Sequence, residues 1–443
     1  MMTPTRRQFL KQGASMAAAF PFILPSRIWS AEVSPNDRIR MGFIGMGKQN
    51  QGLLNHFMRL KDSEAVAVCD VDTNRRKQAR ERVEKHVGTQ QASGHFKGCE
   101  DYNDYQDLLA RSDIDAVCIA TPDHWHALMS VHAAKAKKDI YCEKPLCQSI
   151  KEARRMVQAV RTHKRVFQTG SMQRSSEEFR VACELVRNGI IGPITRVEVA
   201  VGGPAKPCDL PEEAMEPGLD WDRWLGPAPK RPYNSTLSPR GVHNHYPAWR
   251  NYREYGGGGV TDWGAHHFDI AQWGLGMDQE GPRRILPSQN PESGHGVRMV
   301  YQNGVEMIHS DGNGVTFHGK EGKVQVNRGK FAFWLGEKQI ASDRKQCKEV
   351  EQTYLADAKV RLYRSSDHKQ DFLDCVRNRT RPIADVEIGA RTVTICHLVN
   401  LSYYHGQPMQ WNARREQFLQ GKGQAEWLDV DHRAPYQWTS SKS

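Results

Sequence analysis

One lysine stands where it could direct a positive charge at a reacting oxygen. Lys144 lies between Glu143 and Pro145, directly after the apolar run Ile140–Cys142. Oxidation of an alcohol removes a hydride and a proton, so the protein must supply a base, a positive group near the oxygen and a hydride acceptor. Because Pro145 restricts the backbone beside it, Lys144 is a candidate for the positive group. The alternative interpretation is an exposed lysine without a role.

A second pair of polar residues lies more than a hundred positions further on. Asp262 and His266 are four residues apart, so on a helix they would share one face and could both reach a substrate. The glycine run Gly256–Gly259 before them would allow the backbone to approach a bound ring closely. The alternative is a structural histidine on a helix.

Further histidines raise the question of a metal. His267 and Asp269 follow His266, but this spacing puts His266 and Asp269 on one helix face and His267 elsewhere, and the sequence has no H-E-x-x-H motif. We therefore expect no metal site. The loop sequence His243-Asn244-His245 could serve substrate hydrogen bonding or a metal, but exposure without a role fits it better.

A glycine pair points to a dinucleotide. The predicted strand Ile39–Ile44 runs into Gly45-Met46-Gly47, and a helical pattern follows. The first glycine allows a tight turn, the second lets a pyrophosphate approach the backbone, and the helix N-terminus supplies free N–H groups and a favourable dipole. Asn50 stands where a third glycine is usual.

An acid at the end of the next strand indicates which dinucleotide. Asp70 follows the predicted strand Ala65–Cys69. A carboxylate there accepts hydrogen bonds from ribose hydroxyls and would repel a 2′-phosphate, which favours NAD over NADP. Arg75 and Arg76 lie near enough to leave NADP open.

The elements around these motifs predict an α/β fold. Two further short strands, Ala116–Ala120 and Ile140–Cys142, are followed by Thr121-Pro122-Asp123-His124-Trp125-His126 and by Glu143-Lys144-Pro145. Helical patterns lie between the strands, at Leu53–Leu60, Arg75–His86 and His126–Lys137. Alternation of strands and helices predicts a parallel sheet covered on both faces, with ligands at the carboxyl ends of its strands. We expect this Rossmann domain at residues 38–147.

With these motifs the chain resembles the glucose–fructose oxidoreductase/inositol dehydrogenase (Gfo/Idh/MocA) family. The features that carry the resemblance run through most of the chain and are Gly45-Met46-Gly47, Asp70, Thr121-Pro122 with His126, Glu143-Lys144-Pro145, and Asp262-Trp263-Gly264-Ala265-His266. The resemblance implies a Rossmann domain followed by an α/β domain with an open, mostly antiparallel sheet. It also implies hydride transfer between a nicotinamide and a sugar or polyol carbon.

The resemblance also implies roles for individual residues. His266 becomes the acid/base, for which its ordinary pKa of about 6.5 is suited, and Asp262 orients it or the substrate, while Lys144 is the third catalytic candidate. The expected cofactor contacts are Gly45, Met46, Gly47, Asn50, Asp70, Thr121, Pro122, His126, Glu143 and Lys144.

The second domain, at residues 148–443, is expected to bind the substrate and to mediate oligomerisation. We predict that it begins with a helix at Lys151–His163, a strand at Val166–Gly170 and a helix at Ser176–Asn188. Its sheet strands are predicted at Thr195–Val201, Val297–Tyr301, Val305–His309, Gly314–His318 and Lys323–Asn327. C-terminal helices are predicted near Ser366–Arg377 and Gly389–Tyr404. Residues 202–258 have few regular patterns and are rich in tryptophan, as a functional loop region would be. Most of these tryptophans are expected to pack, although aromatic faces also bind sugars. By analogy we expect a homo-oligomer, a dimer or a tetramer.

The N-terminus predicts where the protein works. Arg6 and Arg7, then Phe9-Leu10-Lys11 and the apolar stretch Ala14–Leu24, are typical of a bacterial twin-arginine signal, here residues 1–31. That export machinery carries folded proteins, so we expect a periplasmic or extracytoplasmic protein. Because free NAD is scarce there, we also expect a tightly bound cofactor that is recycled on the enzyme.

Composition excludes several other classes of protein. The net charge of +11 is spread along the chain with no basic block interleaved with aromatics, so we expect no nucleic-acid partner. The ten cysteines form no C-x-x-C, and several lie in apolar runs typical of a core. Three functions stay open: an NAD-dependent sugar or polyol dehydrogenase, an NAD-dependent redox-neutral glycosidase that oxidises, eliminates and reduces, and a non-catalytic sugar-binding module.

Overall fold

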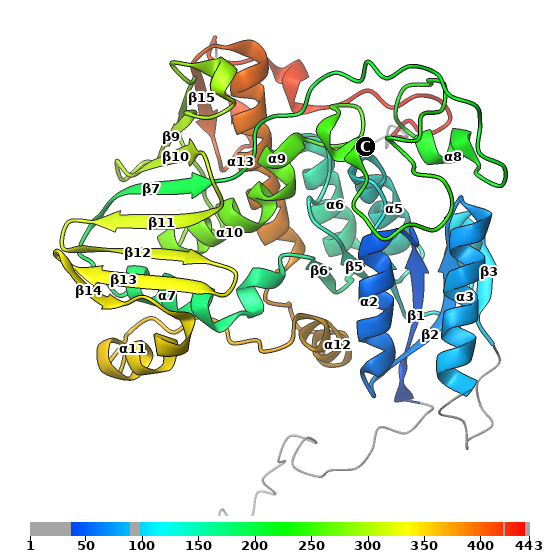
Figure 1. Ribbon diagram of the computed structural model, residues 1–443, viewed down its shortest axis with the longest axis horizontal. Helices are drawn as coiled ribbons and strands as arrows, with labels where there is room; N and C mark the ends of the chain where they lie inside the picture. The colour runs from blue at the N-terminus through cyan, green and yellow to red at the C-terminus, as the bar shows by residue number, and fades with distance from the viewer. Residues whose placement is uncertain (1–36, 89–97, 420, 439–443) are drawn as a thin grey trace, which may run out of the picture. The chain divides into compact units, whose positions relative to one another are not determined.

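The computed structural model describes residues 37–88, 98–419 and 421–438. The predicted signal at residues 1–31 lies outside the described residues. None of the helices in these three ranges combines the length and apolar composition that crossing a bilayer needs. Figure 1 shows two sheets with helices between and around them.

The first sheet has six parallel strands in the order β3-β2-β1-β4-β5-β6. Its strands are β1 (Ile39–Ile44), β2 (Ser63–Cys69), β3 (Glu100–Tyr102), β4 (Ala116–Ile119), β5 (Asp139–Cys142) and β6 (Phe167–Thr169). This is the Rossmann order, with its topological switch point between β1 and β4. Every residue of β4 and β5 is buried, as expected for strands covered on both faces.

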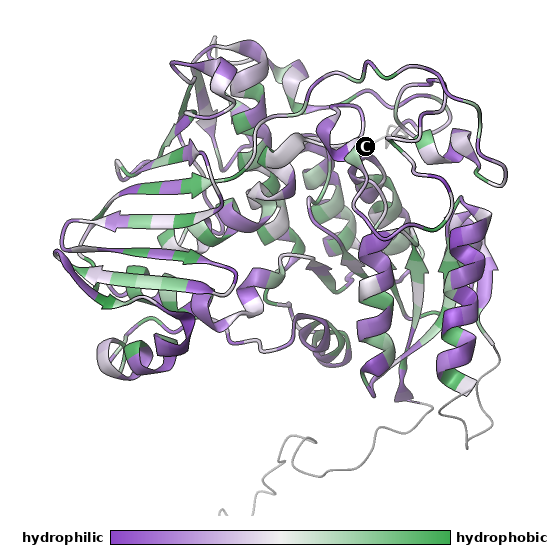
Figure 2. Ribbon diagram, in the orientation of Figure 1, coloured by the Kyte–Doolittle hydropathy of each residue, from purple (hydrophilic) through white to green (hydrophobic). Residues whose placement is uncertain are grey.

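Helices cover the two faces of this sheet. Its helices are α2 (Lys48–Arg59), α3 (Thr73–Gly88), α4 (Tyr105–Ala110), α5 (Asp123–Lys135), α6 (Ile150–Thr162) and α12 (His368–Asn378). Apolar side chains of α2, α3 and α12 share one core with the sheet, and those of α4, α5 and α6 share another. In Figure 2 the outer sides of α2 and α3 are hydrophilic and the strands beside them hydrophobic.

The first sheet continues past the predicted division at residues 147 and 148. The predicted strand Val166–Gly170 is β6, which pairs in parallel with β5 and not with the second sheet. Helix α6, from Ile150 to Thr162, is the crossover that makes this parallel pairing feasible. A capping box of Ser149 and Glu152 starts that helix.

Within the described residues the second sheet has ten strands, of which only β7 and β10 pair in parallel. Its strands are β7 (Ile194–Ala200), β8 (Arg284–Leu286), β9 (Arg298–Val300), β10 (Glu306–Ser310), β11 (Gly314–Gly319), β12 (Gly322–Asn327), β13 (Lys330–Leu335), β14 (Lys338–Ala341), β15 (Met409–Asn412) and β16 (Gln417–Phe418). The predicted fold class, a Rossmann domain followed by a mostly antiparallel sheet, is confirmed.

Buried side chains of the second sheet pack against helices on one face. The helices of this part are α7 (Glu177–Arg187), α8 (Trp221–Leu225), α9 (Gly258–Asp262), α10 (Gly264–Leu275), α11 (Cys347–Tyr354) and α13 (Val386–His405). Buried and more exposed residues alternate along β12, so its other side chains point away from that core.

Helix α13 joins the two cores. Val386, Ala390 and Val393 belong to a core of the first sheet, whereas Ile395 and Leu398 belong to that of the second. Because one rigid helix carries both sets of side chains, the two sheets are held at a fixed distance. The candidate site lies between them.

Candidate active site

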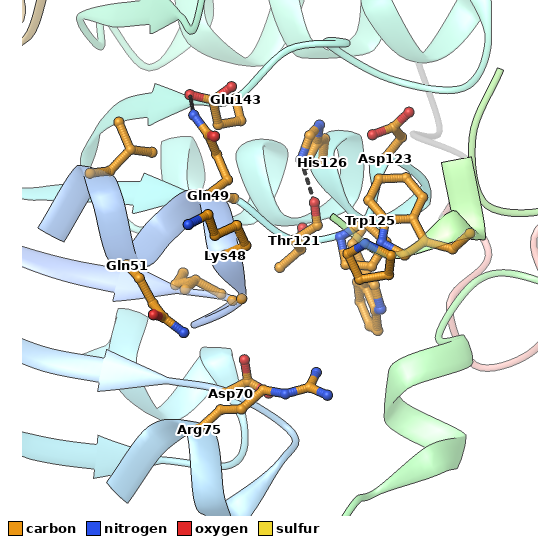
Figure 3. A pocket seen from close by; sticks show the side chains of 18 of the residues that line it. Lys48, Gln49, Gln51, Asp70, Arg75, Thr121, Asp123, Trp125, His126 and Glu143 are labelled. Atoms are coloured by element: carbon orange, nitrogen blue, oxygen red, sulfur yellow. Dashed lines mark hydrogen bonds between the residues drawn. The ribbon is translucent and has the colours of Figure 1, made fainter. Parts of the chain in front are cut away.

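A cavity of about 1110 Å³ opens at the carboxyl ends of β1, β4 and β5. Its lining comes from both halves of the fold. Figure 3 shows lining side chains of the first half, from Lys48 to Glu143. All of the predicted site residues line it except Met46 and Asn50. Lys144, Asp262 and His266, which are far apart in the sequence, therefore face the same space as the glycine turn.

The glycine turn has the shape that a dinucleotide site needs. Gly45 has φ +83°, and a Cβ there would lie 2.7 Å from a methyl carbon of Thr121. Nothing lies within 4 Å of a Cβ added at Gly47, where α2 begins without a side-chain cap. Open space beside uncapped N–H groups suits a pyrophosphate.

Met46 and Asn50, the two predicted site residues outside the cavity lining, stabilise the glycine turn through buried hydrogen bonds. The Asn50 amide donates to the Ile44 carbonyl at 3.1 Å and accepts from the Cys118 thiol at 3.3 Å. Met46 is buried, and its backbone N–H donates to Asp70 Oδ2 at 2.6 Å. These contacts fix the end of β1 and tie the turn to the end of β2.

Asp70 lines the cavity, and the arginines near it are occupied elsewhere. Burial raises the pKa of Asp70, although Arg75 opposes this. Arg75 contacts Asp72 at 3.4 Å and donates to the Gly241 carbonyl at 3.1 Å. Arg76 donates to Asp101 at 3.2 Å and to the Asp70 carbonyl oxygen at 3.2 Å.

A segment of the second domain crosses the end of the cavity beside α2. We call residues 237–250 the strap. Its Tyr246 hydroxyl donates to Gln49 Oε1 at 3.1 Å, and its Asn244 accepts from the Lys48 ammonium. In Figure 1 this green segment passes over the top of α2. Gln49 also donates to Glu143 at 2.9 Å, so the strap is linked to the Glu-Lys-Pro motif (Figure 3).

Lys144 and Asp262 form an ion pair inside the cavity. The Lys144 ammonium donates to Asp262 Oδ1 at 2.5 Å and to the Asp262 carbonyl at 3.1 Å. Burial would raise the pKa of Asp262, but Lys144 and Arg250 hold it below its usual range. The carboxylate is therefore ionised and fixes the position of the ammonium.

The single helix predicted to carry Asp262 and His266 is broken. Asp262 ends α9, and His266 lies in the first turn of α10, with Trp263 between the two helices. Gly264 follows Trp263, and a Cβ there would lie 2.8 Å from the Phe268 ring, so this junction packs too tightly for a side chain. Both residues still reach the cavity.

His266 has no hydrogen-bond partner for its buried Nδ1 atom within the described part of the chain. The Asp262 carboxylate binds Lys144, and no hydrogen bond joins it to His266 among these residues. Burial, together with Lys144 and Arg328, lowers the pKa of His266 well below 6.5. The imidazole is neutral at neutral pH and can accept a proton.

His126 holds two motifs together. Its Nδ1 lies 2.7 Å from the Pro145 carbonyl. Its Nε2 lies 3.0 Å from the Thr121 carbonyl, a contact drawn in Figure 3. Burial lowers the pKa of His126 to about 4. A neutral imidazole between two backbone carbonyls positions the turn after β4 and the turn after β5 relative to each other.

The other histidines contact protein groups. His267 lies 2.5 Å from the Asn313 amide oxygen, and Asp269 accepts from the buried Arg174 at 2.8 Å. His243 lines the cavity, and burial and Arg75 lower its pKa to about 4. Within the described ranges no group of three histidine, cysteine or acidic side chains could hold a metal ion.

The structure places further ionisable residues in the site, among them Asp123, Arg328 and Lys369. Asp123 is only 4% exposed and lines the cavity, and no hydrogen bond or ion pair of its carboxyl exists within the described part. Burial raises the pKa of Asp123 to about 8. Arg328 and the buried Lys369 also line the cavity. The position of Asp123 after Thr121-Pro122 was a usable signal, but the sequence gives none for Arg328, which the β12–β13 turn delivers.

Several tryptophans pack and also face the cavity. Trp221 and Trp224 stack with ring centroids 4.6 Å apart, and Trp224 shares an apolar cluster with Trp249 while it lines the cavity. Trp249 and Trp263 line the cavity, each beneath a guanidinium.

Comparison with known proteins identifies both halves of the chain. Residues 39–171 match the description "Oxidoreductase family, NAD-binding Rossmann fold", and residues 205–438 match "Oxidoreductase family, C-terminal alpha/beta domain". A glycosyl hydrolase family 109 protein of Shewanella pealeana is 32% identical over 219 residues, 45% of this chain and 46% of that protein. One of Shewanella woodyi is 33% identical over 171 residues, 38% of this chain and 35% of that protein. The chain thus matches less than half the length of these curated relatives.

Solved structures share the fold at low sequence identity. The WlbA dehydrogenase from Bordetella pertussis, in complex with NADH and UDP-GlcNAcA, has a TM-score of 0.59 and 16% identity, covering 85% of this chain and 99% of that one. The aldose–aldose oxidoreductase from Caulobacter crescentus has a TM-score of 0.56 and 15% identity, covering 84% and 99%. With the two family matches spanning most of its length, the chain belongs to the Gfo/Idh/MocA family of NAD(P)-binding oxidoreductases.

Proposed function

We propose that this protein transfers a hydride between bound NAD and a hydroxyl-bearing carbon of a sugar or polyol. One observation carries the proposal: Lys144, Asp262 and His266 line the same cavity as the glycine turn. Proteins of similar structure include an aldose–aldose oxidoreductase and a myo-inositol 2-dehydrogenase, and their names support a sugar-like substrate.

The residues at the turn fit a dinucleotide. The cavity is faced by the space over Gly47 at the uncapped start of α2. It is also lined by Thr121, whose buried hydroxyl has no hydrogen-bond partner among the residues that the structure describes. When bound there, NAD would supply a nicotinamide that accepts or returns a hydride. We propose the predicted set from Gly45 to Glu143 as its contacts, with Met46 and Asn50 acting through the shape of the turn.

The chain's own groups would handle the proton and the charge. The hydroxyl proton would pass from the substrate oxygen to the neutral His266 imidazole. The hydride, with its electron pair, would leave the carbon that bears this hydroxyl and pass to the bound nicotinamide. The Lys144 ammonium stabilises the negative charge that develops on the oxygen. Asp262 acts as a positioning residue, because it holds Lys144 at 2.5 Å.

NAD is proposed over NADP because of where the nearby arginines are engaged. Asp70 lies at the end of β2, where a ribose would be read. Arg75 and Arg76 contact Asp72, Asp101 and backbone carbonyls, so they are not free to bind a 2′-phosphate.

The strap supports a tightly held cofactor. A ligand on the turn would have to pass residues joined by Tyr246–Gln49 and Asn244–Lys48 contacts. Slow release would suit a protein exported through the twin-arginine machinery to a compartment poor in NAD. Replacing Arg6 and Arg7 by lysine should keep the protein in the cytoplasm, and an unchanged periplasmic fraction would contradict export by this route.

A second function has a specific observation in its favour. The curated relatives bear the name glycosyl hydrolase family 109. A redox-neutral glycosidase would oxidise a ring hydroxyl, eliminate the aglycone and reduce the product. It would use the same Lys144 and His266, and a retained cofactor suits it equally.

One experiment separates the candidates. The purified protein is denatured to identify its nucleotide, and the loaded protein is screened against sugars, polyols and glycosides. Absorbance at 340 nm and aglycone release are followed together. Accumulation of NADH indicates a dehydrogenase, and aglycone release without accumulation of NADH indicates a glycosidase. If Lys144→Ala leaves every activity intact, a non-catalytic binding module fits better, and a protein without nucleotide contradicts the proposal.

We propose a homo-oligomer, a dimer or tetramer, because side chains of β12 that point away from the described core are partly or fully exposed and could pair with a second copy. The molar mass from light scattering tests this, and a monomer of 50.4 kDa would contradict it.

A further inference from the structure

Two guanidinium groups stand on the wall of the cavity with their hydrogen-bonding edges largely unused. Arg250 packs 4.2 Å above the Trp249 ring, and Arg328 packs 4.7 Å above the Trp263 ring. Stacking holds a guanidinium by its flat face and leaves the N–H groups at its edge free to donate. Both arginines and both tryptophans line the cavity.

Protein acceptors account for few of these donors. Arg250 donates to the Pro247 carbonyl at 3.0 Å, and its Nε lies 3.8 Å from Asp262 Oδ1. No acidic side chain within the described ranges lies within 4 Å of the Arg328 guanidinium. With its amide oxygen turned towards Arg328, Gln173 accepts from Arg328 Nε at 3.2 Å, which leaves the two terminal nitrogens free.

The position of Arg328 is fixed by the fold. It occupies the two-residue turn between β12 and β13, whose ends pair as Asn327 and Lys330. The next residue, Gly329, donates its backbone N–H to Glu178 of α7 at 3.1 Å. An arginine on an anchored turn is preorganised, so less side-chain freedom is lost when it binds a ligand.

The acids nearby do not offset this charge. Asp262 is shared with Lys144, which contacts it at 2.5 Å. Burial raises the pKa of Asp123 to about 8, so this group is mostly neutral at neutral pH. Glu143 also lines the cavity and acts on Arg328 through its charge, although burial raises its pKa. Even with Asp262 and Glu143 both ionised, the three cations Lys144, Arg250 and Arg328 outnumber them. A neutral sugar would therefore leave a positive charge unmatched.

We propose that Arg250 and Arg328 bind an anionic substituent of the substrate, a carboxylate or a sulfate ester. The sugar that enters the cavity is then an acidic one. A planar guanidinium edge matches two acid oxygens in a bidentate manner, which hydroxyl groups cannot reproduce. This inference rests on the proposed function, because it takes the reacting molecule to be a sugar.

The test compares acidic and neutral sugars that otherwise match. Glucuronic acid, glucose 6-sulfate and glucose, with their galactose counterparts, are titrated calorimetrically into the full chain loaded with NAD. Loading fills the pyrophosphate site, so any remaining anion site is a different one. We expect an acidic sugar to bind about tenfold or more tightly than its neutral counterpart, as for a charge-assisted hydrogen bond. The stronger of the two acidic probes identifies the substituent.

Variants assign the difference to the arginine. Arg328→Gln should weaken the acidic probe about 10- to 100-fold and leave the neutral one unchanged. Lys330→Gln, an equal charge loss on the same hairpin outside the cavity lining, should change neither. Equal binding of neutral and acidic sugars, or equal weakening of both by Arg328→Gln, overturns the inference. If no sugar binds, inorganic sulfate is used, and sulfate binding that does not depend on Arg328 overturns it as well.

The two proposals fail separately. Oxidation of neutral sugars without any acid preference would overturn the anion site and leave the hydride-transfer function standing. Arg328-dependent binding of an acidic sugar, with no change at 340 nm and no glycoside cleaved, would support the anion site and count against the proposed function.

Discussion

His266 and Asp262 differ in what surrounds them, although both face one cavity. Asp262 is held ionised by Lys144 and Arg250, whereas burial and the same lysine keep His266 neutral. Surroundings that shift the ionisation of two neighbouring groups in different ways give the two groups different roles in catalysis. The ionised acid positions the ammonium, and the neutral imidazole is left to take the proton.

A pH profile tests the role of His266. A base must be neutral to accept a proton, and the pKa of His266 lies well below 6.5. The acidic limb of kcat/KM for oxidation should therefore lie below pH 6.5. His266→Gln should lower turnover about 10²- to 10⁴-fold, the usual contribution of a general base, without loss of NAD. His267→Gln, which removes a neighbouring histidine outside the cavity lining, serves as the control. A limb above pH 6.5 would contradict the assignment.

Asp123 should make the fold less stable as the pH rises. The pKa of its carboxyl is about 8 in the folded protein against 3.8 ordinarily, because burial disfavours the charge. Between these values the unfolded chain binds fewer protons than the folded one, so the free energy of unfolding falls with increasing pH. Asp123→Asn should remove this contribution, which amounts to about 4 kcal/mol of unfolding free energy between pH 5 and pH 8, at about 1.4 kcal/mol per pH unit.

Urea unfolding at pH 5 and pH 8, with NAD held constant, measures the effect. Asp107→Asn in α4 is the matched control, because Asp107 is an exposed acid in the first turn of a helix. Equal slopes for Asp123→Asn and the parent protein would show that Asp123 is already ionised in the fold.

Some site residues were readable from the sequence and others were not. Gly45 and Asp70 directly follow a strand, and Lys144 lies two residues after one, so these strands predict their place at one edge of the sheet. Arg328 reaches the cavity only because β12 and β13 pair in a particular register, and no local pattern records that. The pairing of Asp262 with Lys144 likewise depends on tertiary structure.

At the scale of elements, two glycines near the start of α2 should respond to alanine in opposite ways. Gly45→Ala forces a side chain onto a φ of +83° and against Thr121, so we expect loss of NAD binding and a cost of about 1–3 kcal/mol. Gly52→Ala lies inside α2 with nothing within 4 Å, and should stabilise the protein by about 0.5–1 kcal/mol. Thermal melting and nucleotide content measure both. A Gly45→Ala protein that keeps its nucleotide would rule out the tight turn as the reason for this glycine.

The strap should control how slowly NAD leaves. Combining Tyr246→Phe with Asn244→Ala removes its hydrogen bonds to Gln49 and Lys48. At about 0.5–1.5 kcal/mol per bond, release should become roughly 5- to 100-fold faster. Stopped-flow fluorescence follows the release. Tyr363→Phe, which removes a hydroxyl bond to Asp371 outside the cavity lining, should leave the rate unchanged. An unaltered rate in the double variant would mean that the strap does not gate the cofactor.

Element types were easier to predict than their limits or partners. The helices predicted at Leu53–Leu60 and His126–Lys137 are α2 and α5, but both begin earlier. The prediction missed their first turns because these are largely polar and lack the apolar spacing of a packed helix. Strand β3, with the polar sequence Glu100–Tyr102, was missed because it carries no apolar run. The strand at Val166–Gly170 was predicted without a pairing partner, and the structure pairs it with β5, because the α6 crossover brings it beside that strand.

At the scale of the whole molecule, the cavity exists only because two sheets are held apart at one distance. Helix α13 contributes side chains to both cores. Its sequence is apolar on almost all sides, so it does not show which residues pack against which sheet. The fold of the second half was expected from family resemblance, since its short strands alone do not specify their order. Placement of Lys144 opposite His266 is therefore a property of the assembled fold.

A ligand that contacts both halves should stabilise them together, and only the correct nucleotide should do so fully. Protein stripped of nucleotide and given NAD at about 100 times Kd should gain about 2.7 kcal/mol, seen as a rise of a few degrees in Tm. NADP at the same concentration should give less, because Asp70 repels the 2′-phosphate while Arg75 is engaged with Asp72. Asp70→Asn should narrow the gap between the two nucleotides, and Asp107→Asn should not. Differential scanning fluorimetry measures all of these, and equal shifts for NAD and NADP in the parent protein would refute the assignment of Asp70 as the selecting group.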